Sequence, residues 1–173
     1  MTHGRLHTVR VPDGAGELAG LLVAVRRARV VEVTGPGESG RRLVRAAAER
    51  LASNFLDGVA VVELEHPHGP AELWAALGSV EGMPFLPFGT GDPIRWLAGQ
   101  DVLLVLGGSD HLSIEARIWL RRLRGRGPGV RLLMAGRHSL GLGDAETLPM
   151  WRGPRRDHPE ADTCHSMAAP FSR

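Results

Sequence analysis

A glycine-rich segment lies between a β-branched stretch and a helical pattern, and its spacing fits a phosphate-binding loop. The template has two glycines four residues apart, followed by lysine and then serine or threonine. The segment reads Gly35-Pro36-Gly37-Glu38-Ser39-Gly40-Arg41-Arg42. Both template glycines are in register, and backbone N–H groups with the positive end of a helix hold phosphate without any side chain. We predict nucleotide or phosphate binding by residues 35–42, with a plain structural turn as the alternative.

The two positions after the second glycine depart from the template. Arg41 stands in place of the lysine, and its planar fork is not equivalent to a compact ammonium. Arg42 stands in place of the hydroxyl residue that binds Mg²⁺, and a guanidinium has no acceptor for a metal. All 21 basic residues are arginine, so no lysine elsewhere can substitute. We therefore expect ATP or ADP to be bound without Mg²⁺, with Arg42 a candidate to occupy the place of the metal.

Two further segments that could carry chemistry follow the apolar stretches 102–106 and 130–135. In P-loop NTPases a strand ends in an acid that holds Mg²⁺, and Gly107 occupies that position here. Asp110 is interpreted either as a residue that holds a water or, preferably, as the cap of a helix starting near residue 112. Arg137, after the second stretch, is a candidate contact to a terminal phosphate, with a solvated loop residue as the alternative.

The elements that must position these residues alternate along the chain. Strands are predicted at 30–33, 59–64, 102–106 and 130–135, and helices at 41–53, 70–77, 92–98 and 112–124. A further helix is predicted before the first strand, with Glu17 in its first turn and Arg26, Arg27 and Arg29 near its end. A candidate edge strand covers 6–11, and Asp13 is a candidate helix cap. Such alternation predicts an α/β fold with a mainly parallel sheet covered on both faces. Sites in these sheets lie at the carboxyl ends of the strands, which would bring the three segments together.

Length and composition narrow the class of protein. The 173 residues suit one domain, expected at 13–150, with an N-terminal extension at 1–12 and a disordered tail at 151–173. A single cysteine excludes an internal disulfide and a multi-cysteine zinc site. The net charge of +2 gives no argument for nucleic acid. The apolar runs are too short to cross a membrane and no signal peptide is recognised, so we expect a cytoplasmic location without membrane binding.

Five segments occur in an order that is shared with one family of nucleotide-binding domains. They are Gly14-Ala15-Gly16-Glu17-Leu18, residues 31–43 (VEVTGPGESGRRL), 57–64 (DGVAVVEL), 103–111 (LLVLGGSDH) and 133–142 (LMAGRHSLGL). On these segments the chain resembles the STAND (NB-ARC-like) ATPase domain of actinobacterial transcriptional regulators of the SARP and large LuxR types. The resemblance implies a three-layer P-loop NTPase-type sandwich. It also implies that the 130–135 strand lies between the other two motif strands, which would bring Arg137 near the loop.

Position by position, the resemblance identifies a degenerate site. Gly35, Gly37, Gly40 and Arg41 match the phosphate loop. Gly107 stands where the family has its Mg²⁺-linked aspartate, Asp110 stands where it has glutamate, and Arg137 matches the arginine of the sensor segment. Phosphoryl transfer depends on Mg²⁺ and positioned charge, so loss of the metal-side residues should remove most of the rate. No catalytic and no metal-binding residue is expected.

The sequence therefore predicts a non-hydrolysing nucleotide-binding protein linked to transcriptional regulation or signalling. The alternative is a ligand-free interaction module that pairs with a full-length regulator or with itself. Its docking face would be the helix stripe Arg117, Arg121 and Arg124, for which a solvated basic face is the favoured interpretation. An active ATPase ranks last, and direct DNA binding is not expected because no recognition helix is visible.

Overall fold

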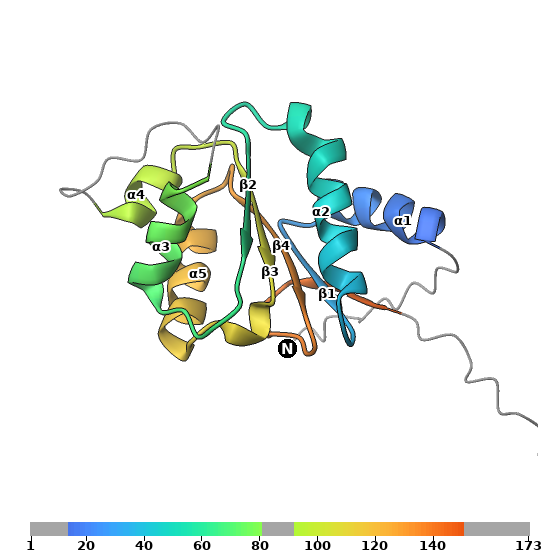
Figure 1. Cartoon of the computed structure of the whole chain (residues 1–173). Coiled ribbons are helices and arrows are strands. Elements are labelled where there is room, and N and C mark those ends of the chain that lie inside the picture. Colours follow the sequence, from blue (N-terminus) through green and yellow to red (C-terminus); the bar gives the residue numbers. More distant parts are fainter. Residues whose placement is uncertain (1–13, 81–91, 151–173) are drawn as a thin grey trace, which may run out of the picture.

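A five-stranded parallel sheet forms the centre of the molecule. The computed structural model describes residues 14–80 and 92–150. The strands are β1 (Val30–Thr34), β2 (Val59–Glu63), β3 (Leu103–Gly107), β4 (Arg131–Gly136) and β5 (Glu146–Pro149). Their order across the sheet is β2-β3-β4-β1-β5, and every pair is parallel (Figure 1). This confirms the predicted α/β class and places β4 between β1 and β3, as the resemblance implied.

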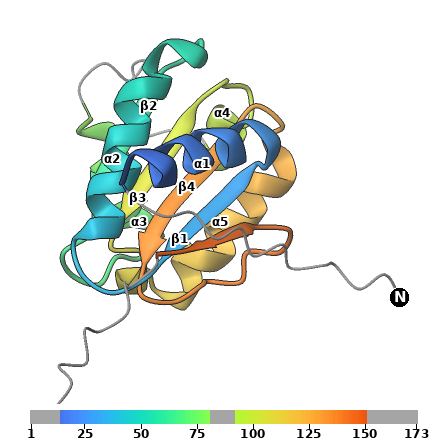
Figure 2. The same cartoon turned by 90° about the vertical axis from the view of Figure 1, so that its right-hand side faces the viewer.

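Helices cover both faces of the sheet. They are α1 (Gly14–Arg27), α2 (Ser39–Leu51), α3 (Pro70–Gly78), α4 (Pro93–Leu97) and α5 (Ile114–Arg126), with short 3₁₀ turns η1 (Ala52–Asn54) and η2 (Ser109–His111). Helices α1 and α2 pack on one face, and α3, α4 and α5 pack on the other (Figures 1 and 2). None of the described helices combines the length and apolar character needed to cross a bilayer.

Strand β3 shows how the sequence specifies this three-layer arrangement. Every residue of β3 is buried. Leu103 and Val105 face α1 and α2, while Leu104 and Leu106 face α3, α4 and α5, because successive side chains of a strand point to opposite faces. A strand buried on both faces requires the continuous apolar run that the sequence contains. Each fully buried leucine contributes about 2 kcal/mol relative to an exposed one.

Several predicted boundaries shift, and one strand was missed. Helix α2 begins at Ser39, two residues before the predicted start, and α5 begins at Ile114 rather than at residue 112. Strand β5 was not predicted because it is short, sits at the edge of the sheet and is only partly buried. The candidate strand at 6–11, the cap Asp13, the extension and the tail lie outside the described residues, so these remain predictions.

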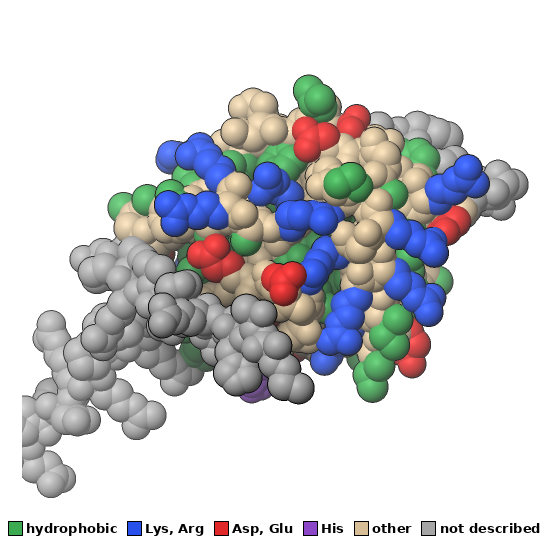
Figure 3. Space-filling view, turned by 180° about the vertical axis from the view of Figure 1, so that it is seen from behind, with side chains coloured by type: hydrophobic (Ala, Val, Ile, Leu, Met, Phe, Trp, Pro, Cys, Tyr) green, Lys and Arg blue, Asp and Glu red, His purple; other side chains and the backbone are tan. Residues whose placement is uncertain are grey.

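The arginine stripe on α5 has a structural role. Arg121 donates a hydrogen bond to the carbonyl of Gly141 at 2.9 Å, and Arg124 forms an ion pair with Asp144 at 3.1 Å. Arg117 donates to the carbonyl of Leu112 at 3.1 Å, within the approach to α5 itself. Arginine side chains are numerous on the face seen in Figure 3. Arg121 is exposed, as the favoured interpretation of a solvated face expects, and both Arg121 and Arg124 also contact the segment that leads into β5.

Candidate functional site

The glycine-rich segment forms a loop that wraps around the start of α2. Strand β1 ends at Thr34 and α2 begins at Ser39, so four residues make the turn. Gly37 has a φ of +79°, a left-handed conformation that glycine adopts without strain. At Gly35 a Cβ atom would stand 2.7 Å from the Cβ of Met150, so a side chain here would push the end of β5 away. The Gly35 N–H donates to the carbonyl of Gly136 at 3.0 Å, which ties the loop to β4.

The start of α2 leaves a run of backbone donors available. The N–H of Arg42 donates to the carbonyl of Glu38 at 3.0 Å and is the first of the helix to do so. No described residue accepts a hydrogen bond from the N–H groups of residues 37–41, and the Glu38 side chain does not cap the helix. Unpaired donors at a helix start carry a partial positive charge that attracts anions. The loop therefore has the backbone properties that the sequence predicted for an anion cradle.

A pocket of about 320 Å³ opens between this loop and the ends of β3 and β4. It is lined by Gly35, Gly37, Glu38, Gly40, Arg41, Gly108, Asp110, His111, Ala135, Gly136 and Arg137. Seven of the ten predicted site residues thus border one cavity. The other three, Pro36, Ser39 and Arg42, are exposed and do not line it. These residues come together because β4 lies between β1 and β3 and all three strands end at the same edge of the sheet.

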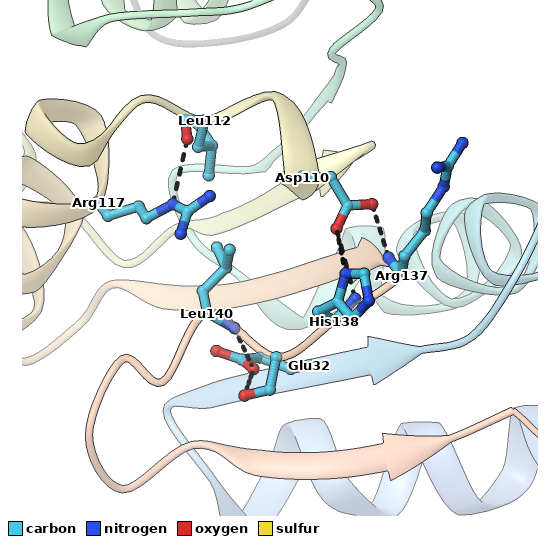
Figure 4. Close-up of polar contacts among 8 residues, drawn as sticks. Glu32, Asp110, Leu112, Arg117, Arg137, His138 and Leu140 are labelled. Atoms are coloured by element: carbon cyan, nitrogen blue, oxygen red, sulfur yellow. Dashed lines mark hydrogen bonds and ion pairs between the residues drawn. The ribbon is translucent and has the colours of Figure 1, made fainter.

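Asp110 does not cap α5, and the favoured interpretation of this residue was wrong. The cap is Ser113, whose hydroxyl oxygen accepts from the N–H of Ala116 at 3.2 Å, whereas Asp110 lies within the 3₁₀ turn η2 that precedes the helix. Asp110 instead accepts from the N–H of Arg137 at 2.6 Å and from that of His138 at 3.4 Å (Figure 4). Its Oδ1 also stands 3.7 Å from Nδ1 of His138. Asp110 therefore fixes the loop after β4 and, through its backbone, the position of Arg137.

Arg41 and Arg42, which stand in place of the lysine and the hydroxyl residue of the template, lie in different surroundings. The Arg41 guanidinium lies over Gly108, where a Cβ atom would stand 2.8 Å from its Nη2. No described residue forms a hydrogen bond or ion pair with the Arg41 side chain, so its charge faces the pocket without a partner. Arg42 is exposed and outside the pocket lining. The structure therefore gives no support to the suggestion that Arg42 takes the place of Mg²⁺, and Arg41 and Arg137 are the arginines that line the pocket.

Sequence reasoning missed Glu63, which ends β2. Glu63 pairs with Gly107 in the parallel register, and its Oε2 would collide with any Cβ atom at Gly107. Its Oε1 accepts from Nη2 of Arg45 at 3.0 Å, while Oε2 is buried without a partner. The available signal was that the predicted strands 59–64 and 102–106 end near Glu63 and Gly107. The sequence did not show where the Glu63 carboxylate points.

The residues around the end of β3 do not fit a Mg²⁺ ion. Gly107 offers no side chain, Arg42 offers no acceptor, and the Glu63 carboxylate is paired with Arg45 and does not line the pocket. Within 14–80 and 92–150, no group of three or more His, Cys, Asp or Glu residues is placed to hold a metal. Magnesium prefers several oxygen ligands, which this set does not supply.

Comparison with known proteins agrees with the topology. No family model and no curated protein matches the sequence. Among solved structures, the chain is similar to a Walker-type ATPase of Pyrococcus abyssi, with a TM-score of 0.54 and 12% identity over 78% of this chain and 53% of that one. The fold is that of the P-loop NTPases. At this identity the similarity shows the fold alone, and the chain spans about half the length of that ATPase.

In the P-loop NTPase fold, the phosphate loop joins a strand to the following helix. Residues 35–38 occupy that connection between β1 and α2. The described residues therefore combine a P-loop NTPase-like fold with a glycine-rich loop in which Arg41 and Arg42 follow the second template glycine.

Proposed function

We propose that this protein binds a nucleotide, ATP or ADP, through its phosphates at the pocket between the β1–α2 loop and the ends of β3 and β4, and does not hydrolyse it. The observation that carries the proposal is the run of unpaired N–H groups at residues 37–41 beside the free guanidinium of Arg41. Both are positive and both border the same cavity. Backbone donors and a guanidinium are the groups that hold phosphate oxygens.

The residues around the pocket also support the proposal that the bound nucleotide is not hydrolysed. Hydrolysis in this fold uses a metal ion to offset the developing charge on the transferred phosphoryl group. Gly107 and Arg42 supply no ligand for that ion, and the Glu63 carboxylate at the end of β2 is paired with Arg45. Asp110, at the position of the family's glutamate, accepts two backbone N–H groups and holds the β4 loop. We propose that nucleotide occupancy acts as a signal, in transcriptional regulation or a related pathway, as the resemblance to STAND domains implies.

Isothermal titration calorimetry in EDTA, with ATP and with ADP, tests the proposal. Wild-type protein should release or absorb heat with a defined stoichiometry. Arg41→Ala should weaken binding about tenfold or more, because a charge-assisted hydrogen bond is worth about 1.5–3 kcal/mol. Arg50→Ala is the matched control, since Arg50 is exposed in the last turn of the same helix. No binding by the wild type at millimolar nucleotide would contradict the proposal.

A protein-interaction role is the second candidate. The observation that favours it is an apolar pair on α5, where Ile114 is 70% exposed and Ile118 is 42% exposed. Four residues apart, the two side chains lie on the same side of the helix. The partner would be a related full-length regulator or a second copy of the chain. Light scattering on the wild type and on the double variant Ile114→Ser/Ile118→Ser tests self-association, and two monomeric proteins would exclude the second copy.

A further inference from the structure

The Arg45–Glu63 ion pair lies beside Gly107, at the end of the β2–β3 strand pair and next to the pocket residue Gly108. Glu63 belongs to β2 and Arg45 to α2, one helical turn after Arg41. We infer that this pair replaces both the metal-linked acid and its cation, so that the pocket selects nucleotide phosphates that carry no divalent cation. The inference rests on the proposed nucleotide binding and specifies the form of the ligand.

Glu63 fills the space of a side chain at position 107. Glu63 and Gly107 are register partners at the ends of neighbouring strands, and both side-chain positions face α2. The Glu63 carboxylate occupies the volume into which a side chain at position 107 would project. An acid on β3 and the observed conformation of Glu63 therefore exclude each other. With the Glu63 carboxylate in this position, only a glycine fits at position 107.

The negative charge of Glu63 has a partner outside the pocket. Glu63 is already neutralised by Arg45, whose Nη2 lies 3.0 Å from Oε1. The other oxygen, Oε2, is buried and packs against Gly107, away from the pocket lining. Glu63 therefore offers no free carboxylate oxygen to a cation at the end of β3. Close by, the Arg41 guanidinium lies over Gly108 without a partner of its own.

We expect the pocket to prefer ATP without Mg²⁺ over ATP bound to Mg²⁺. In ATP bound to Mg²⁺, the ion offsets the phosphate charge that Arg41 would otherwise meet, and the ion itself is repelled by the guanidinium. Free ATP presents its full charge to Arg41 and to the N–H groups of residues 37–41. We expect wild-type protein to bind ATP about fivefold or more tightly in EDTA than in Mg²⁺ at matched ionic strength.

The experiment measures the ratio of the two dissociation constants for ATP, in Mg²⁺ and in EDTA, by calorimetry. Wild type should give a ratio of about five or more. Arg45→Met removes the cation from Glu63 and frees its carboxylate to bind Mg²⁺, so the ratio should fall to about one or below. Arg50→Met, a change of the same kind at an exposed position on α2, should leave the ratio as in the wild type. A ratio is insensitive to a general loss of affinity or stability, which would act on both constants.

A second variant tests the same preference if Arg45→Met misfolds. In Glu63→Gly/Gly107→Asp the acid returns to β3, and ATP should bind more tightly in Mg²⁺ than in EDTA. A wild-type ratio of one or below, or a ratio unchanged in both variants, would overturn the inference while nucleotide binding stands. Absence of binding in both buffers would overturn the proposed function itself, and the inference with it.

Discussion

Glu63 and Gly107 are partners in the register of β2 and β3, and the carboxylate of the first fills the side-chain space of the second. The carboxylate that P-loop NTPases carry at the end of this strand therefore has a counterpart here on the neighbouring strand. That counterpart is paired with Arg45 and does not line the pocket, so while the ion pair holds it does not restore a metal site.

The neighbouring glycines 107 and 108 should respond differently to alanine. Gly108 has a φ of +74°, and a Cβ atom there would collide with the backbone carbonyl of Leu64. Gly108→Ala should therefore cost about 2–3 kcal/mol of unfolding free energy. Gly107→Ala should cost about 1 kcal/mol or less, because Glu63 can swing away and lose only a partly exposed ion pair. Urea denaturation measures both, and equal costs would contradict the assigned contacts.

Asp110 should hold the loop after β4. Asp110→Ala removes the acceptor of the Arg137 and His138 N–H groups, so we expect a loss of about 1–2 kcal/mol in unfolding free energy. Amide hydrogen exchange at Arg137 should accelerate in the variant. Asp144→Ala serves as the control, since Asp144 forms only an exposed ion pair and should change stability by less than about 0.5 kcal/mol. Unchanged exchange at Arg137 would argue against the role given to Asp110.

Glu32 should be energetically coupled to Ser139. Glu32 is buried in β1, where its Oε2 accepts from the Ser139 hydroxyl and from the N–H of Leu140, the latter at 3.0 Å. Glu32→Ala should destabilise the fold by about 2–3 kcal/mol, because it leaves the donors without their acceptor. A double-mutant cycle with Ser139→Ala should give a coupling of about 1 kcal/mol or more. Additive effects would show that the contact contributes nothing.

The carboxyl of Glu115 should titrate below the ordinary range of glutamate. A backbone N–H at the start of α5, and secondarily the Ser113 hydroxyl, favour the charged form and lower its pKa. A lowered pKa in the folded state means that the charged form adds stability above the unfolded pKa. This stability is lost as the pH falls through the folded pKa. An NMR pH titration should show the lowered pKa in wild type and a shift back towards the ordinary value in Ser113→Ala; identical curves would contradict this cause.

Long buried elements could be predicted from the sequence because burial on both faces requires an unbroken apolar run, as in β3. Strand β5 carries no such signal, since Glu146 and Thr147 are partly exposed at the sheet edge. The cradle could be predicted because glycine spacing determines backbone geometry.

The role of Asp110 was assigned wrongly because an aspartate before an apolar run is typical of a helix cap, and the short turn η2 that contains Asp110 leaves no periodic pattern. The Glu63–Gly107 exchange was missed for a different reason. It depends on the register of two strands that are 44 residues apart and on the direction of one side chain. Neither property is encoded in local spacing.

NMR on ¹⁵N-labelled protein titrated with ADP in EDTA tests the central claim most directly, because it reports on the backbone N–H groups themselves. The account predicts the largest amide shift changes at Gly37, Ser39, Gly40 and Arg41, with smaller changes at Arg137 across the pocket. Arg50, at the far end of α2, should not shift. Shift changes confined to other parts of the chain, or none at millimolar ADP, would show that the loop around the start of α2 is a structural turn and not a phosphate site.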